Sequence, residues 1–125
     1  MCIRDRSRRG TWDAIADRLG PDVKLIDLAL DWVFERYRVD PERVAIGGFS
    51  DGGSYALTLG LANGGLFRAV LAFSPGFMAP PRVEGRPRIF ISHGRADRVL
   101  PVERCGRPLA RRLSLIHISE PTRPY

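Results

Sequence analysis

The residues with the clearest chemical potential lie in the stretch Gly48-Phe49-Ser50-Asp51-Gly52, which has a serine between two glycines. A short apolar run, Val44 to Ile46, precedes it, and an alanine- and leucine-rich run follows. This pattern predicts a strand, a sharp turn and a helix, with the Ser50 hydroxyl raised at the turn as a nucleophile. Gly48 and Gly52 would keep Cβ atoms out of the narrow space between strand and helix. The backbone N–H of Asp51 would then face a developing oxyanion.

A second motif lies downstream, where His93-Gly94 is followed by Asp97 beyond an apolar run. A carboxylate after a strand can orient a histidine and stabilise its imidazolium form, so Asp97 is the candidate acid of a catalytic triad. His93 is only four residues from Asp97, which is too close along the chain for it to be the base that this acid must face. A solvated loop aspartate is the simpler alternative for Asp97.

The chain resembles the α/β-hydrolase superfamily, and within it the phospholipase/carboxylesterase and dienelactone-hydrolase-like esterases. The resemblance is carried by the Gly48–Gly52 stretch, by the preceding turn at residues 39–43, and by residues 91–101. It implies that Ser50 is the nucleophile, that Asp97 is the acid and that His93 is structural. It also implies a base further downstream and a second oxyanion donor upstream, with no metal or organic cofactor and a small-molecule ester as substrate.

The elements that must position these residues follow from hydrophobic periodicity. We expect a partial α/β-hydrolase fold in one domain, with parallel strands and helices on both faces. The predicted helices cover residues 21–36, 53–62 and 102–113, the predicted strands cover 44–46, 67–73 and 87–92, and a surface loop covers 78–86. The first helix has an apolar stripe of Leu25, Leu28 and Trp32, which we expect to pack on the sheet.

Composition argues against several other classes of function. The 125 residues have a net charge of +6, but Lys24 is the only lysine and the arginines are scattered among acidic residues. No basic run suggests nucleic-acid binding, and no apolar run approaches the ~18 residues that span a bilayer. Cys2 and Cys105 have neither a metal-site nor a disulfide spacing. The oligomeric state stays open.

The two ends of the chain are related at the level of codons. Residues 1–6 can be encoded by DNA whose complementary strand encodes residues 113–117, and this inverted repeat resembles translated sequencing-adapter sequence. We therefore expect residues 1–6 and 113–125 to be non-native, and residues 7–112 to be the partial hydrolase domain.

The expected function is cleavage of carboxylic esters through an acyl-enzyme. Because no second native histidine follows Asp97 in residues 7–112, we expect this chain itself to have little activity. A thioesterase, a polyester depolymerase or a serine peptidase on the same fold is a close alternative. A non-catalytic hydrolase-like binding module is the alternative from another class.

Overall fold

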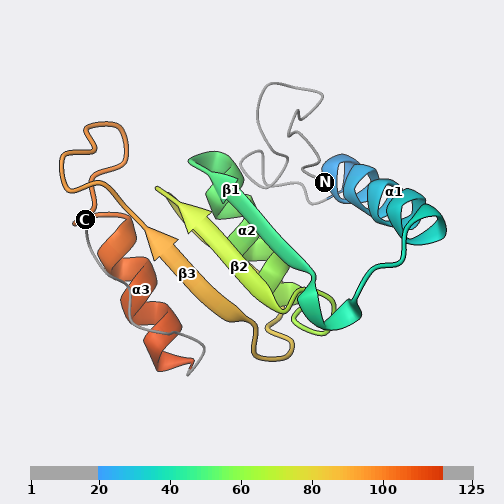
Figure 1. Cartoon of the computed structure of the whole chain (residues 1–125). Coiled ribbons are helices and arrows are strands. Elements are labelled where there is room, and N and C mark those ends of the chain that lie inside the picture. Colours follow the sequence, from blue (N-terminus) through green and yellow to red (C-terminus); the bar gives the residue numbers. More distant parts are fainter. Residues whose placement is uncertain (1–19, 117–125) are drawn as a thin grey trace.

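The computed structural model describes residues 20–116, which contain a three-stranded parallel sheet in the order β1-β2-β3 (Figure 1). The strands are β1 (Ala45–Phe49), β2 (Ala69–Phe73) and β3 (Arg88–Ser92). Phe49 pairs with Phe73, and Phe73 pairs with Ser92. The carboxyl ends of all three strands are therefore level with one another at one edge of the sheet.

Within this described range, three helices and one short 3₁₀ helix accompany the sheet, and they are α1 (Pro21–Arg36), η2 (Pro41–Arg43), α2 (Asp51–Ala62) and α3 (Gly106–Leu115). The predicted partial α/β fold is confirmed. The last helix begins four residues later than predicted, because residues 102–105 form a turn in which the Cys105 N–H donates to the Pro101 carbonyl at 2.9 Å. The expected non-native segment at residues 1–6 and the end from residue 117 lie outside the described residues.

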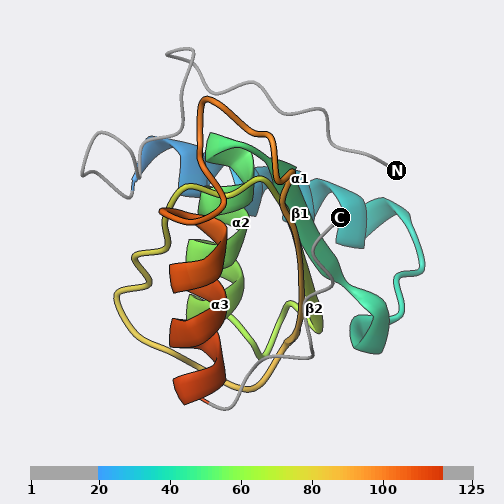
Figure 2. The same cartoon turned by 90° about the vertical axis from the view of Figure 1, so that its left-hand side faces the viewer.

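The hydrophobic core lies between the sheet and two helices that share one face, α2 and α3 (Figure 2). Alternate strand residues point into it, and α2 is buried from Gly52 to Ala62. The core side chains are those of Leu57 and Leu61 on α2, Leu109 and Leu113 on α3, and Val70, Ala72, Ile89 and Ile91 on the strands. Full burial of each leucine stabilises the fold by about 2 kcal/mol. The opposite face exposes Leu71, Phe73 and Phe90.

Helix α1 begins as predicted, with Pro21 in its first turn, and ends at Arg36. Its apolar stripe is not buried against the sheet, however, since Leu28 is 67% exposed and Trp32 is 44% exposed. The expectation that α1 packs on the sheet is therefore wrong for the described residues. Figure 1 shows α1 beyond β1, which is an edge strand of this sheet, so no strand of residues 20–116 stands there to cover the stripe. Among the helices at 20–116, none combines the length and apolar character that crossing a membrane requires.

Strand β1 and the first turn of α2 approach each other very closely at Gly48. A Cβ atom at Gly48 would lie 2.2 Å from the Gly52 carbonyl oxygen, and one at Gly53 would lie 3.0 Å from the Gly48 carbonyl oxygen. Backbone therefore packs directly on backbone at this point. The predicted reason for the glycine at position 48 agrees with this geometry, and Gly53 contributes to the same contact.

We predict that Gly48→Ala destabilises the chain by about 3 kcal/mol, because strand and helix must separate to admit the methyl group. Gly65→Ala is the matched control. A Cβ at Gly65 would meet only the Glu84 side chain, at 3.6 Å, so its effect is expected to stay within about 0.5 kcal/mol. Urea unfolding followed by circular dichroism measures both changes. Equal stability of the two variants would contradict the close approach.

Candidate active site

Ser50 follows the last residue of β1 directly and precedes the first residue of α2. Its backbone has φ 58° and ψ −122°, in a region that residues with a side chain rarely adopt. The Ser50 N–H donates to the Phe73 carbonyl at 2.8 Å, and the Ser50 carbonyl accepts from the Ser54 N–H at 3.1 Å. The hydroxyl does not cap the helix. These bonds hold the backbone in its strained conformation from both the sheet and the helix.

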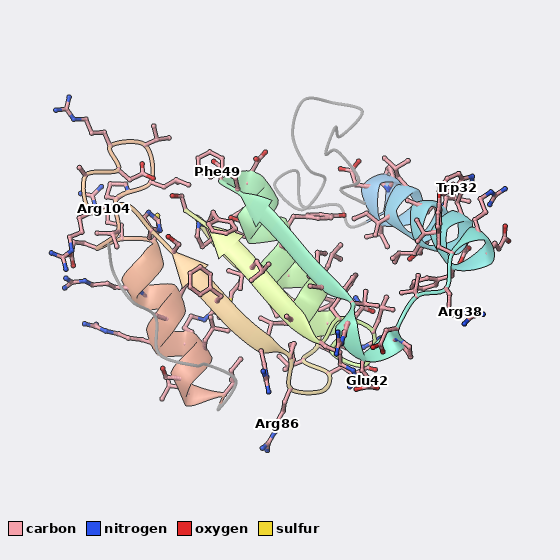
Figure 3. The ribbon with its side chains drawn as sticks, in the orientation of Figure 1. Trp32, Arg38, Glu42, Phe49, Arg86 and Arg104 are labelled. Carbon is pink, nitrogen blue, oxygen red and sulfur yellow. The ribbon has the colours of Figure 1, made fainter. Side chains whose placement is uncertain are left out.

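Asp51 is the first residue of α2, and its carboxylate accepts a hydrogen bond from the Gly52 N–H at 2.9 Å. The backbone N–H groups in the first turn of a helix have no carbonyl partners within that helix. They also carry the positive end of the helix dipole. Asp51 stands in this first turn, directly after Ser50. Phe49, which precedes Ser50, is 70% exposed at the end of β1 (Figure 3).

Asp97 lies in the loop after β3, and its side chain is 19% exposed. Its Oδ1 atom accepts hydrogen bonds from the Val99 and Leu100 N–H groups, both at 2.9 Å. The bond from Leu100 contributes most to lowering the pKa of Asp97 below its ordinary value of 3.8; partial burial opposes this, and Val99, His93 and Ser74 add to it. The carboxylate is thus held ionised by the backbone of its own loop.

His93 is buried at the start of the same loop. Its Nε2 atom makes a short hydrogen bond to the Leu100 carbonyl oxygen, so Nε2 carries the proton. Nε2 is 3.7 Å from Asp97 Oδ2, which is too long for a hydrogen bond. Nδ1 is buried without a hydrogen-bond partner and faces Gly106, where a Cβ would lie only 2.8 Å away. Neither ring nitrogen is therefore open to a nucleophile.

The level strand ends bring the sequence-predicted residues to one edge of the sheet. Ser50 follows β1 and His93 follows β3, with β2 between them. Neighbouring strands are about 4.8 Å apart, so the backbones of Ser50 and His93 are separated by about 10 Å across this edge. Residues 20–116 contain no cluster of His, Cys, Asp or Glu that could hold a metal ion.

Sequence reasoning did not find the polar residues that connect α2 to the loop after β2. Ser54 and Thr58 are fully buried on α2. Ser54 Oγ accepts from the N–H groups of Gly76 at 2.9 Å and Phe77 at 3.2 Å, and Thr58 Oγ1 accepts from Ala79 N–H at 3.1 Å. Their spacing of four residues in an otherwise apolar helix was the available signal, because it places both hydroxyls on one face.

The parallel sheet with its helices is a partial α/β-hydrolase fold, in which a serine at a strained turn joins a parallel strand to a helix. The chain belongs to the phospholipase/carboxylesterase family, whose model matches residues 14–114.

Two solved structures have a similar fold. Esterase PE8 is 24% identical with a TM-score of 0.69, and the match covers 82% of this chain and 49% of that one. A thermostable esterase is 23% identical with a TM-score of 0.66, and the match covers 83% of this chain and 28% of that one. The chain thus spans half or less of these esterases. No curated protein sequence matches it.

We predict a pH-dependent effect of Asp97→Asn on stability. The folded-state pKa of Asp97 is lowered, so its stabilising effect is complete above the unfolded value near 3.8 and disappears as pH falls through the folded value. At neutral pH the Asn variant should be less stable than the native chain, and this difference should close below pH 3.8. Thermal unfolding across pH measures the difference. Asp31→Asn on α1 is the control. A difference in stability between Asp97→Asn and the native chain that does not change with pH would contradict the prediction.

Proposed function

We propose that this chain is part of a serine hydrolase that cleaves carboxylic esters through an acyl-enzyme, with Ser50 as the nucleophile. The observation that carries this proposal is the backbone of Ser50, with φ 58° between a parallel strand and a helix N-terminus. Strain of this kind costs about 1–3 kcal/mol, and it persists where the surrounding structure imposes it, commonly at functional sites. Family membership and two esterases of similar fold support the same activity.

In this proposal the Ser50 Oγ attacks the ester carbonyl carbon while a base takes its proton. The carbonyl oxygen becomes an oxyanion, which the N–H of Asp51 and the dipole of α2 stabilise. Collapse of this intermediate expels the alcohol and leaves the acyl group on Ser50. Water then attacks the acyl-enzyme and releases the acid. A second N–H donor completes the oxyanion site from outside the described residues.

Asp97 would orient the base. Its Oδ1 atom is engaged by two backbone N–H groups of its own loop, which leaves Oδ2 to accept a hydrogen bond from an imidazole N–H. An ionised carboxylate at this position selects the histidine tautomer whose other nitrogen faces the serine. The lowered pKa of Asp97 keeps it ionised for that role at neutral pH.

His93 does not fit the role of the base, because Nε2 donates to Leu100 and Nδ1 is closed off by Gly106. We therefore propose that the base comes from outside residues 20–116, and that the 125-residue chain alone retains only weak residual catalysis. An ester is preferred to a thioester, a polyester or a peptide because both structural neighbours are named esterases. A non-catalytic binding module would show no acyl transfer at all.

We predict that the purified chain becomes acylated at Ser50 by an activated ester such as p-nitrophenyl acetate when imidazole replaces the missing base. Acylation should increase with imidazole, and the adduct should accumulate because deacylation also needs a positioned base. Mass spectrometry of the peptide that contains Ser50 measures the adduct.

Ser50→Ala is the matched control, because imidazole reacts directly with the ester to the same extent whichever protein is present. Equal acylation of both proteins would contradict Ser50 as the nucleophile. Turnover at ordinary esterase rates without imidazole, abolished in Ser50→Ala, would contradict the proposal that the base is missing.

A further inference from the structure

The Ser54 hydroxyl makes hydrogen bonds in three directions from a fully buried position on α2. It accepts from the N–H groups of Gly76 at 2.9 Å and Phe77 at 3.2 Å. It also donates to the Ser50 carbonyl at 3.3 Å. A hydroxyl has one proton and two acceptor lone pairs, so these three bonds use its whole capacity. Because both lone pairs face the loop after β2, the proton is directed to Ser50.

These bonds complete a circuit around the turn that carries the candidate nucleophile. The Ser50 N–H donates to the carbonyl of Phe73, the last residue of β2, at 2.8 Å. The Ser50 carbonyl is joined through the Ser54 hydroxyl to Gly76, which follows Phe73 in the loop after β2. Both polar backbone groups of Ser50 are therefore connected to residues 73–77. The strained turn and the loop after β2 hold each other in place.

Thr58, one helical turn further along α2, makes the same kinds of bond at a greater distance from the nucleophile. It is fully buried, and its hydroxyl accepts from the Ala79 N–H at 3.1 Å. Its proton goes to the Ser54 carbonyl at 2.9 Å rather than to Ser50. Thr58 thus holds the same loop without binding the Ser50 backbone, which makes it a matched comparison for Ser54.

We infer that Ser54 is a positioning residue for Ser50, in that its hydroxyl fixes the turn that carries the nucleophile against the loop after β2. Parallel α/β sheets bind their ligands beyond the carboxyl ends of the strands, where this turn and this loop both lie. A shift between the two would change where an ester carbonyl meets the Ser50 hydroxyl. This consequence for catalysis rests on the proposed function, in which Ser50 is the nucleophile.

The first test measures amide hydrogen exchange by NMR in the full 125-residue chain with Ser54→Ala. This variant removes the hydroxyl and adds no polar group. Exchange of the Gly76 and Phe77 N–H groups should become about tenfold faster, because each loses its hydrogen-bond acceptor. The Ser50 N–H keeps its own acceptor, yet its exchange should also become severalfold faster, because the circuit that holds the turn is opened.

Thr58→Val is the matched control, and it should speed exchange of the Ala79 N–H while leaving that of Ser50 unchanged. Exchange of Leu61, in the core of the same helix, shows any change in global stability. The inference is overturned if Ser54→Ala leaves the Ser50 N–H unchanged relative to Leu61, or if Thr58→Val speeds it equally. Ser54→Cys, whose thiol is only a weak acceptor and donor, replaces the alanine variant if that variant does not fold.

The rate of acylation gives a second readout, measured with p-nitrophenyl acetate and imidazole at a temperature where all three proteins are folded. Acylation of Ser50 should be about tenfold slower in Ser54→Ala and within about twofold of the native rate in Thr58→Val. An equal loss in both variants would overturn the inference. If Ser50 is acylated in none of the proteins, the proposed function fails, and exchange of the Ser50 N–H still decides the role of Ser54.

Discussion

The described structure depends on the direct backbone contact between β1 and α2 at Gly48 and Gly53. Because no side chain separates them, the chain must turn from strand to helix at one residue, and that residue is Ser50 with its positive φ. A looser contact would allow a longer, unstrained connection. The close approach also places the N-terminus of α2 beside the carboxyl end of the sheet, where the helix dipole can act on an anion.

Two buried hydroxyls on α2 also fix the loop that follows β2 at the carboxyl end of the sheet. Ser54 and Thr58 satisfy backbone N–H groups of the loop after β2, which would otherwise be buried without partners at a cost of about 1–3 kcal/mol each. That loop passes close to Leu100, since a Cβ at Gly76 would lie 3.3 Å from the Leu100 side chain. The Leu100 N–H binds Asp97, and its carbonyl binds His93. The conformations of three consecutive strand ends are therefore coupled through polar groups rather than through the hydrophobic core alone.

The sequence was most informative where the determinants are local. The glycines around Ser50 and the apolar runs beside them predicted a strand, a turn and a helix, because only small residues permit that turn. The bounds of α1 were readable from Pro21 and its periodicity. The exposure of its apolar stripe could not be predicted from the sequence, because burial of the stripe depends on which strands stand beside β1. Likewise the positive φ of Ser74, 47°, follows from no distinctive sequence motif, since its N–H binds the Ser92 carbonyl of β3, which is distant in sequence.

The strain at Ser50 can be measured directly with two variants that both lack the hydroxyl. Ser50→Gly relieves positive φ, whereas Ser50→Ala keeps the Cβ, so the difference in stability between them reports only on the backbone. Urea unfolding should show the glycine variant to be more stable than the alanine variant by about 1 kcal/mol. An alanine variant at least as stable as the glycine variant would contradict the account.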